Sequence, residues 1–324
     1  MFSKLVKTSV PSNFIIIPVI ILTGWWSFIL GIEHVTWSNN KSILLSVLPP
    51  EIFTFPWGSV ISVAMVMVVA LIMIPFTARY FYSITGNVLP SVFFIALSSQ
   101  IMWISVQGAS LIAIFLFLFI FRNLFEVYHK NRVFGFVFNA GFLSGLSVLI
   151  YFPSVLFLIV CWAGIILLRP FSFREFFTAL TGAIIPLIFT HALFMILGHE
   201  PKLYNLIENN FITTPFIFND IRQIIWISFL AIFVFWSIVK VMLSGTLKKI
   251  VIRRYFETFL VTIILFSIVL ISPYSDNGIF AMLLIPISYI ISISVASIRK
   301  IFYADIIILL MILMQIFVQL PYFR

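Results

Sequence analysis

Apolar stretches of about 20 residues, separated by short polar or charged connections, make up most of this chain. A helix needs roughly 20 apolar residues to cross the hydrocarbon core of a bilayer, since it rises only about 1.5 Å per residue. The stretches of suitable length cover residues 14–32, 58–77, 88–105, 108–125, 134–151, 152–168, 177–197, 222–243, 256–272, 277–296 and 302–320. The sequence therefore predicts an all-α, polytopic transmembrane bundle of about eleven spans.

The composition agrees with a bilayer as the solvent. Of the 324 residues, 63% are hydrophobic and only 9% are charged, whereas a soluble domain carries about 25% charged residues. We expect one integral membrane domain over residues 1–324, because no Gly/Ser-rich linker or charge run divides the chain. The first stretch is longer than the apolar part of a signal peptide and lacks a small-residue cleavage site, so we expect a retained helix.

The distribution of basic residues predicts the orientation of the chain. If the N-terminus lies in the cytoplasm and the spans alternate, four of the 19 lysines and arginines face outward, namely Lys41, Lys202, Arg222 and Arg324, and the other fifteen face the cytoplasm. This is the positive-inside pattern. We therefore expect a bacterial cytoplasmic (inner) membrane protein with its C-terminus outside. The net charge of +9 serves membrane orientation in this interpretation, and nucleic-acid binding is not indicated.

Two long connections, residues 33–57 and 198–221, would lie on the outer face. Glu33 and His34 open the first of them directly after the first span. An acid held at the membrane surface can act as a general base, because partial desolvation raises its pKa toward neutrality. Glu33 and His34 are therefore candidate catalytic residues. The alternative is an ordinary charged helix end that keeps the span from sliding.

The second outer connection carries charges of both signs and includes Lys202 and Arg222. Lysine and arginine side chains bind phosphate or pyrophosphate as cations. These two residues are therefore candidates for substrate binding. The alternative is a solvated loop with incidental ion pairs.

Several kinds of chemistry find no support in the residues. No acid lies near the middle of a predicted span, which argues against ion-coupled transport, and neither a P-loop nor an HExxH motif is present. Of the histidines, His34, His191 and His199 fall near the outer face and could in principle bind zinc, or they could be interfacial hydrogen-bonding residues. The single cysteine, Cys161, lies in an apolar stretch and excludes an internal disulfide. The residues themselves indicate no metal or other cofactor.

Two local patterns predict packing and ion pairing. Ala140, Gly141, Ser144 and Gly145 form a patch of small residues, which lets two helices approach closely in a membrane. Glu257 follows Arg253 and Arg254 at helical spacing and predicts a salt-bridged helix end.

An acid at the start of the first outer loop, with a second outer loop between spans seven and eight, resembles the layout of the C superfamily of membrane glycosyltransferases. Segment 140–154 is also similar to that family's turn between its fifth and sixth spans. The resemblance covers about residues 1–243. It implies a polyprenyl-phosphate-linked sugar as the donor, with Glu33 as base or as ligand of a divalent metal, and with Lys202 or Arg222 at the lipid phosphate.

Segment 168–175 (Leu-Arg-Pro-Phe-Ser-Phe-Arg-Glu) resembles a signature of an uncharacterised family of bacterial inner-membrane proteins, which implies no activity. Three functions therefore stay open: a glycosyltransferase-like protein, a non-enzymatic subunit or scaffold of a membrane envelope complex, and a transporter or flippase. The expected partners are the lipid bilayer, a polyprenyl-phosphate lipid and other membrane proteins.

Overall fold

The computed structural model describes residues 42–45, 57–86, 88–101, 108–128, 130, 132–196, 221–245, 247, 249–271 and 277–298, together with 302–303, 306–307 and 310–311. Within this part of the chain the regular structure is helical throughout, without a strand. The predicted all-α class is therefore confirmed for the described residues.

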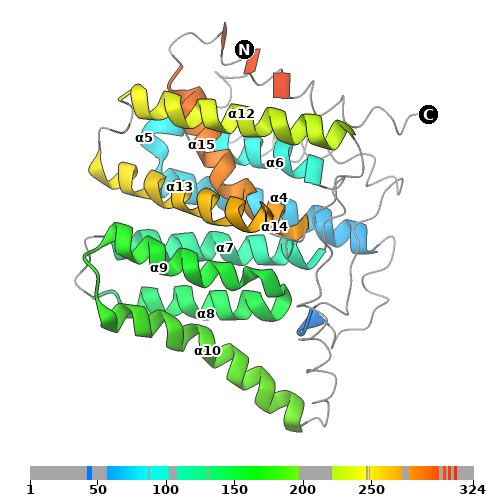
Figure 1. Ribbon diagram of the computed structural model, residues 1–324, viewed down its shortest axis with the longest axis vertical. Helices are drawn as coiled ribbons and strands as arrows, with labels where there is room; N and C mark the ends of the chain where they lie inside the picture. The colour runs from blue at the N-terminus through cyan, green and yellow to red at the C-terminus, as the bar shows by residue number, and fades with distance from the viewer. Residues whose placement is uncertain are drawn as a thin grey trace.

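Figure 1 labels the helices, and nine of the predicted stretches contain one or more of them. The helices are α4 (Trp57–Tyr80), α5 (Tyr82–Thr85), α6 (Leu89–Ile101), α7 (Gly108–Val127), α8 (Phe134–Ile150), α9 (Leu156–Leu168), α10 (Phe173–Ile196), α12 (Ile221–Leu243), α13 (Ile250–Ile271), α14 (Asn277–Met282) and α15 (Leu284–Ala296). The predicted span 14–32 lies outside the described residues, and so does most of 302–320.

Four of the described helices are long and apolar enough to cross a membrane. They are Val60–Tyr80 in α4, Gly108–Val127 (α7), Phe173–Ile196 (α10) and Ile224–Leu243 in α12. Exposed large apolar side chains such as Ile188 and Phe189 of α10 would be costly in water and are suited to contact with lipid tails. The chain thus has the character of a membrane protein.

Helix boundaries differ from the predicted stretches in two ways. First, α10 begins at Phe173 and α13 at Ile250, several residues before the apolar stretches begin, because a helix continues through a charged end whose long side chains reach the membrane surface. Second, the stretch 277–296 is divided at Leu283 into α14 and α15. Pro286 has no amide to bond the carbonyl of Met282. Between the two helices the Leu283 amide donates to the Phe280 carbonyl, three residues earlier, as in a tight 3₁₀ turn.

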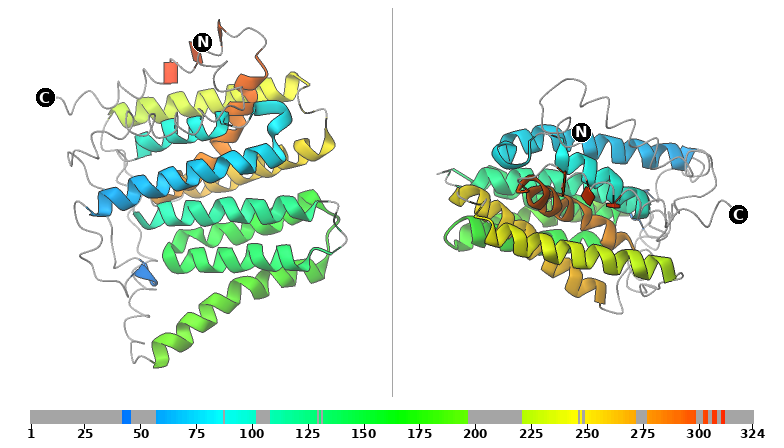
Figure 2. Two further views of the ribbon diagram at one scale, coloured as in Figure 1. Left: turned by 180° about the vertical axis from the view of Figure 1, so that it is seen from behind. Right: turned by 90° about the horizontal axis from the view of Figure 1, so that it is seen from above.

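Helices α4, α7, α8 and α10 lie side by side in that order, as Figures 1 and 2 show. Helices α7 and α8 run antiparallel, whereas α4 runs parallel to α7 and α8 runs parallel to α10. Helix α15 crosses the upper part of this arrangement, packed against α6, α12 and α13. Every residue of α15 from Leu284 to Val295 is buried. A helix that is apolar on all sides and enclosed by others is a core helix rather than a lipid-facing one.

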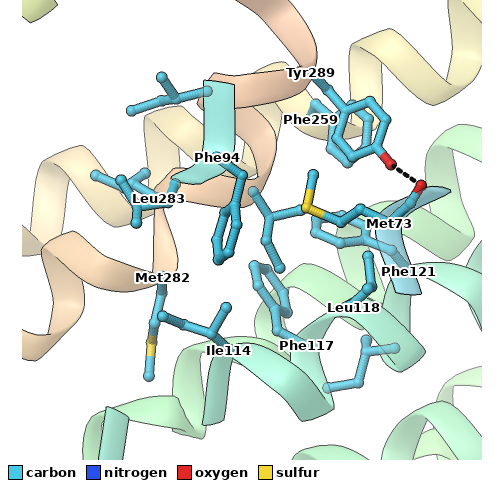
Figure 3. Close-up of a cluster of buried hydrophobic side chains, with 14 of the residues drawn as sticks. Met73, Phe94, Ile114, Phe117, Leu118, Phe121, Phe259, Met282, Leu283 and Tyr289 are labelled. Carbon is cyan, nitrogen blue, oxygen red and sulfur yellow. Dashed lines mark hydrogen bonds between the residues drawn. The ribbon is translucent and has the colours of Figure 1, made fainter. Parts of the chain in front are cut away.

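Aromatic side chains from distant parts of the chain form the centre of this packing. Phe125 stacks on Tyr255 with ring centroids 4.1 Å apart, and Phe117 stacks on Phe157 at 4.0 Å. Figure 3 shows Tyr289 of α15 beside Phe259 and close to Met73, and the Tyr289 hydroxyl lies 2.8 Å from Thr77 Oγ1. In lipid such helices associate through van der Waals packing and interhelical hydrogen bonds, since the surrounding tails are as apolar as the side chains.

Helices α8 and α10 approach each other so closely that three glycines at their contact have no room for a Cβ atom. A Cβ atom on Gly141 would lie 2.0 Å from the Ala179 carbonyl oxygen, and one on Gly145 would lie 2.1 Å from that of Ala183. From the other helix, a Cβ on Gly182 would lie 2.5 Å from the Phe138 oxygen. The prediction that the small-residue patch packs against a neighbouring helix is confirmed, and the neighbour is α10.

Candidate functional site

The candidate catalytic and binding residues lie at the edge of, or beyond, the part of the chain that the structure describes. Glu33, His34 and Lys202 fall outside it. Arg222 belongs to the first turn of α12, with its side chain outside the description. Their predicted roles in catalysis and phosphate binding therefore stay predictions.

Of the outer histidines, His191 is described, and it is an exposed residue of α10. The described residues contain no group of three or more His, Cys, Asp or Glu side chains placed to hold a metal ion. Cys161 is fully buried within an apolar helix, as a small apolar residue would be.

One contact ties the first long connection to the ends of α8 and α10, where α4 and α12 begin. We call it the loop contact, and it consists of Ile43 from the first connection, Leu149 near the end of α8, and Phe194 near the end of α10, all three of them buried. The Leu44 amide donates a hydrogen bond to the Leu149 carbonyl at 3.0 Å. Residues 42–45 of the first connection are thereby held beside the C-terminal ends of α8 and α10.

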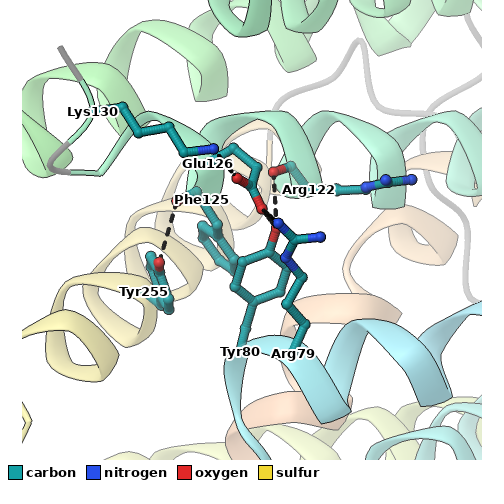
Figure 4. A network of polar contacts seen from close by, with 7 residues as sticks. All are labelled: Arg79, Tyr80, Arg122, Phe125, Glu126, Lys130 and Tyr255. Carbon is teal, nitrogen blue, oxygen red and sulfur yellow. Dashed lines mark hydrogen bonds and ion pairs between the residues drawn. The ribbon is translucent and has the colours of Figure 1, made fainter. Parts of the chain in front are cut away.

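A second polar feature lies at the opposite end of the helices, around Glu126 of α7. This carboxylate, whose side chain is only 10% exposed, forms ion pairs with Arg79 at 2.5 Å and with Lys130. It also accepts a hydrogen bond from the Tyr80 hydroxyl at 2.6 Å. Figure 4 shows these side chains converging from the end of α4 and the end of α7. We call this group the Glu126 cluster.

Further bonds tie other helix ends to the same place. Arg169, directly after α9, donates to the Lys130 carbonyl at 2.6 Å and lies 3.6 Å from the carboxylate of Glu175 in α10. The Tyr255 hydroxyl of α13 donates to the Phe125 carbonyl at 3.2 Å. The connections from α9 to α10 and from α12 to α13 also lie at this end (Figure 1).

The described charged side chains all gather at this end, which we call the basic end. Glu257 pairs there with Arg253 and Arg254 at 3.1 and 2.9 Å, which confirms the predicted salt-bridged helix end. The basic side chains are Arg79, Arg122, Lys130, Arg132, Arg169, Arg174, Lys240, Lys249, Arg253 and Arg254, against the acids Glu126, Glu175 and Glu257. The excess of positive charge is suited to an anionic membrane surface.

Comparisons with known proteins assign no family. No protein-family model matches the chain, and neither a curated protein nor a solved structure matches it significantly. The resemblances described above therefore remain expectations.

Sequence reasoning did not single out the Glu126 cluster. One of its ion pairs can be predicted from the sequence, because Glu126 and Lys130 are spaced i, i+4 on one helix. The contacts that Arg79 and Tyr80 of α4 make with Glu126 cannot be predicted in this way, since nothing in the local sequence places them opposite a residue more than 40 positions later.

Proposed function

We propose that the chain is a multi-pass protein of the bacterial cytoplasmic membrane, with the basic end in the cytoplasm and with about eleven spans. Support for this orientation comes from the gathering of the described basic side chains at one end of the bundle, because lysine and arginine are retained on the cytoplasmic side. In this orientation the loop contact lies at the outer face.

Epitope tags test the orientation in the full-length chain. One tag is inserted after Gly245, whose neighbourhood leaves open space, and the other after Gly198. We expect an antibody to reach the tag at Gly198 in intact spheroplasts and the tag at Gly245 only after permeabilisation. The reverse labelling would mean that the basic end faces outward.

We further propose that the outer face carries a glycosyltransferase-like activity that uses a polyprenyl-phosphate-linked sugar. The loop contact is the observation that supports it, because Ile43 of the first connection and Phe194 at the entry to the second are packed together with Leu149. Part of the first connection thus lies beside the helix end that precedes the second, which supports a single site that draws residues from both. In this proposal Glu33, beside His34, takes the proton from an acceptor hydroxyl. The new bond joins that oxygen to the sugar, the bond from the sugar to the polyprenyl phosphate breaks, and Lys202 or Arg222 binds the departing phosphate.

Substitution of Glu33 tests this activity. In liposomes that contain a polyprenyl-phosphate-linked sugar, Glu33→Gln should abolish consumption of the donor by transfer to an acceptor hydroxyl or to water, because the amide cannot accept the proton of the attacking oxygen. Glu51→Gln, which makes the same charge change in the same connection, is the matched control and should retain consumption. Equal rates for Glu33→Gln and the unmodified chain would remove Glu33 from the mechanism.

The second proposal, a scaffold in an envelope complex, is supported by α10. This helix packs through one face against α8, and its C-terminal part diverges from the bundle (Figure 1). It exposes large apolar side chains there, among them Ile188, Phe189 and Ile196. Purification in mild detergent separates the two proposals: a stoichiometric protein partner without polyprenyl lipid favours the scaffold.

Transport receives less support from the described residues. One pocket, lined by residues of α12, of the C-terminal half of α13 and of segment 280–287, has a volume of about 280 Å³, and its lining is apolar apart from Ser267. Such a lining offers an ion or a sugar no set of polar ligands.

A further inference from the structure

A groove between α4 and α7 opens at the basic end and does not belong to the proposed outer site. It has a volume of about 200 Å³ and is lined by residues of the segments 72–80 in α4 and 118–122 in α7. Phe76 and Leu118 form its buried floor, while Pro75 and Phe119 form more exposed walls. We call it the α4–α7 groove.

The groove is amphipathic along its length. Its lining residues in α4 span from Ile72 to Arg79, which is roughly 10 Å of helix at 1.5 Å per residue. The apolar side chains lie toward the middle of the helices, and Arg79 and Arg122 lie at the end nearest the helix terminus. A ligand that fits must therefore combine an apolar chain with an anionic group, in that order along the helix axis.

The two arginines carry positive charge that the cluster does not neutralise. Glu126 is shared between Arg79 and Lys130, so its single negative charge is already matched by the lysine. Arg122 has no ion-pair partner among the described residues, and Figure 4 shows its guanidinium group turned away from Glu126. Planar guanidinium groups bind phosphate oxygens through paired hydrogen bonds.

We propose that the α4–α7 groove binds an anionic phospholipid, with the lipid phosphate between Arg79 and Arg122 and the first part of one acyl chain on Pro75, Leu118 and Phe119. A groove smaller than the ~300–1,000 Å³ of pockets that enclose a whole ligand is sufficient here, because the remainder of the lipid stays in the bilayer. The site is independent of sugar transfer, since it lies at the basic end of the bundle.

Detergent-purified full-length protein allows a direct binding test. Dioctanoyl phosphatidylglycerol, dioctanoyl phosphatidylcholine and inorganic phosphate are titrated separately, and the shift in thermal unfolding midpoint gives each dissociation constant, because a ligand of the folded state stabilises it. Unfolding is followed by thiol labelling of Cys161, the single cysteine, which is fully buried in the folded chain. We expect saturable binding of the anionic lipid and weaker binding of the zwitterionic one.

Variants assign the binding to the groove. Arg122→Gln should weaken binding of the anionic lipid about tenfold, because it removes one charge-assisted contact to phosphate, and Arg122→Lys should bind with intermediate strength. Arg132→Gln removes another exposed positive charge at the same end, outside the groove, and should bind the anionic lipid as the unmodified chain does. Equal losses of affinity for the anionic lipid in Arg122→Gln and Arg132→Gln would overturn the proposal. Inorganic phosphate that bound as tightly as the anionic lipid would overturn it as well.

Discussion

The close approach of α8 and α10 makes Gly141→Ala an informative substitution. The new Cβ atom would lie 2.0 Å from the Ala179 carbonyl oxygen, whereas ordinary van der Waals contact begins at 3.4 Å. The difference requires the backbones to separate by about 1.4 Å, and a gap of 0.5–1 Å already removes a quarter to a half of a dispersion contact. Since the contacting atom belongs to the backbone, no side-chain rotation can relieve the clash.

The expected loss is about 3 kcal/mol of unfolding free energy, at the upper end of the cost of overpacking. This loss exceeds the stabilisation of up to about 1 kcal/mol that alanine gains over glycine inside a helix. At roughly 2 °C per kcal/mol for a large domain, the unfolding midpoint should fall by a few degrees. Labelling of Cys161 during heating in mild detergent measures it, because this thiol is buried until the bundle opens.

Gly135→Ala is the matched control on the same helix. The new Cβ atom would meet nothing within 4 Å. Alanine favours the helical conformation more than glycine does, so this variant should raise the unfolding midpoint slightly. If Gly141→Ala unfolded at the same temperature as Gly135→Ala, α8 and α10 could not approach each other as closely as described.

Two further substitutions probe the polar contacts between helices. Glu126→Gln should lower the unfolding free energy by about 1–2 kcal/mol in the Cys161 assay, because two ion pairs to a carboxylate that is only 10% exposed are lost. The Glu257 carboxylate is 25% exposed and pairs within its own helix, so Glu257→Gln should cost well under ~1 kcal/mol. A larger loss for Glu257→Gln would contradict this ranking. Tyr289→Phe removes the hydroxyl that lies 2.8 Å from Thr77 Oγ1. It should lower the unfolding free energy by about 0.6 kcal/mol, the average for interhelical hydrogen bonds in membranes. If neither Tyr289→Phe nor Thr77→Val changed the unfolding midpoint, this bond would contribute nothing to stability.

The sequence by itself determined where the helices lie and how the charges are distributed. Long apolar stretches become helices in lipid, because only a helix satisfies all its backbone hydrogen bonds within one segment. The placement of α4, α7 and α12 followed from that requirement. The spacing of Glu257 after Arg253 and Arg254 likewise sufficed for their ion pairs, since residues three and four apart share one helical face.

Only the tertiary structure decided which helices are neighbours and which apolar faces are buried. In water, hydropathy separates core from surface, but in a bilayer both the core and the lipid-facing surface are apolar. Consequently α15, buried from Leu284 to Val295, and α10, with Ile188 and Phe189 exposed, look alike in sequence. For the same reason the partner of the Gly141 patch, the α4 side of the Glu126 cluster and the meeting of Ile43 with Phe194 depend on long-range packing that no local pattern encodes.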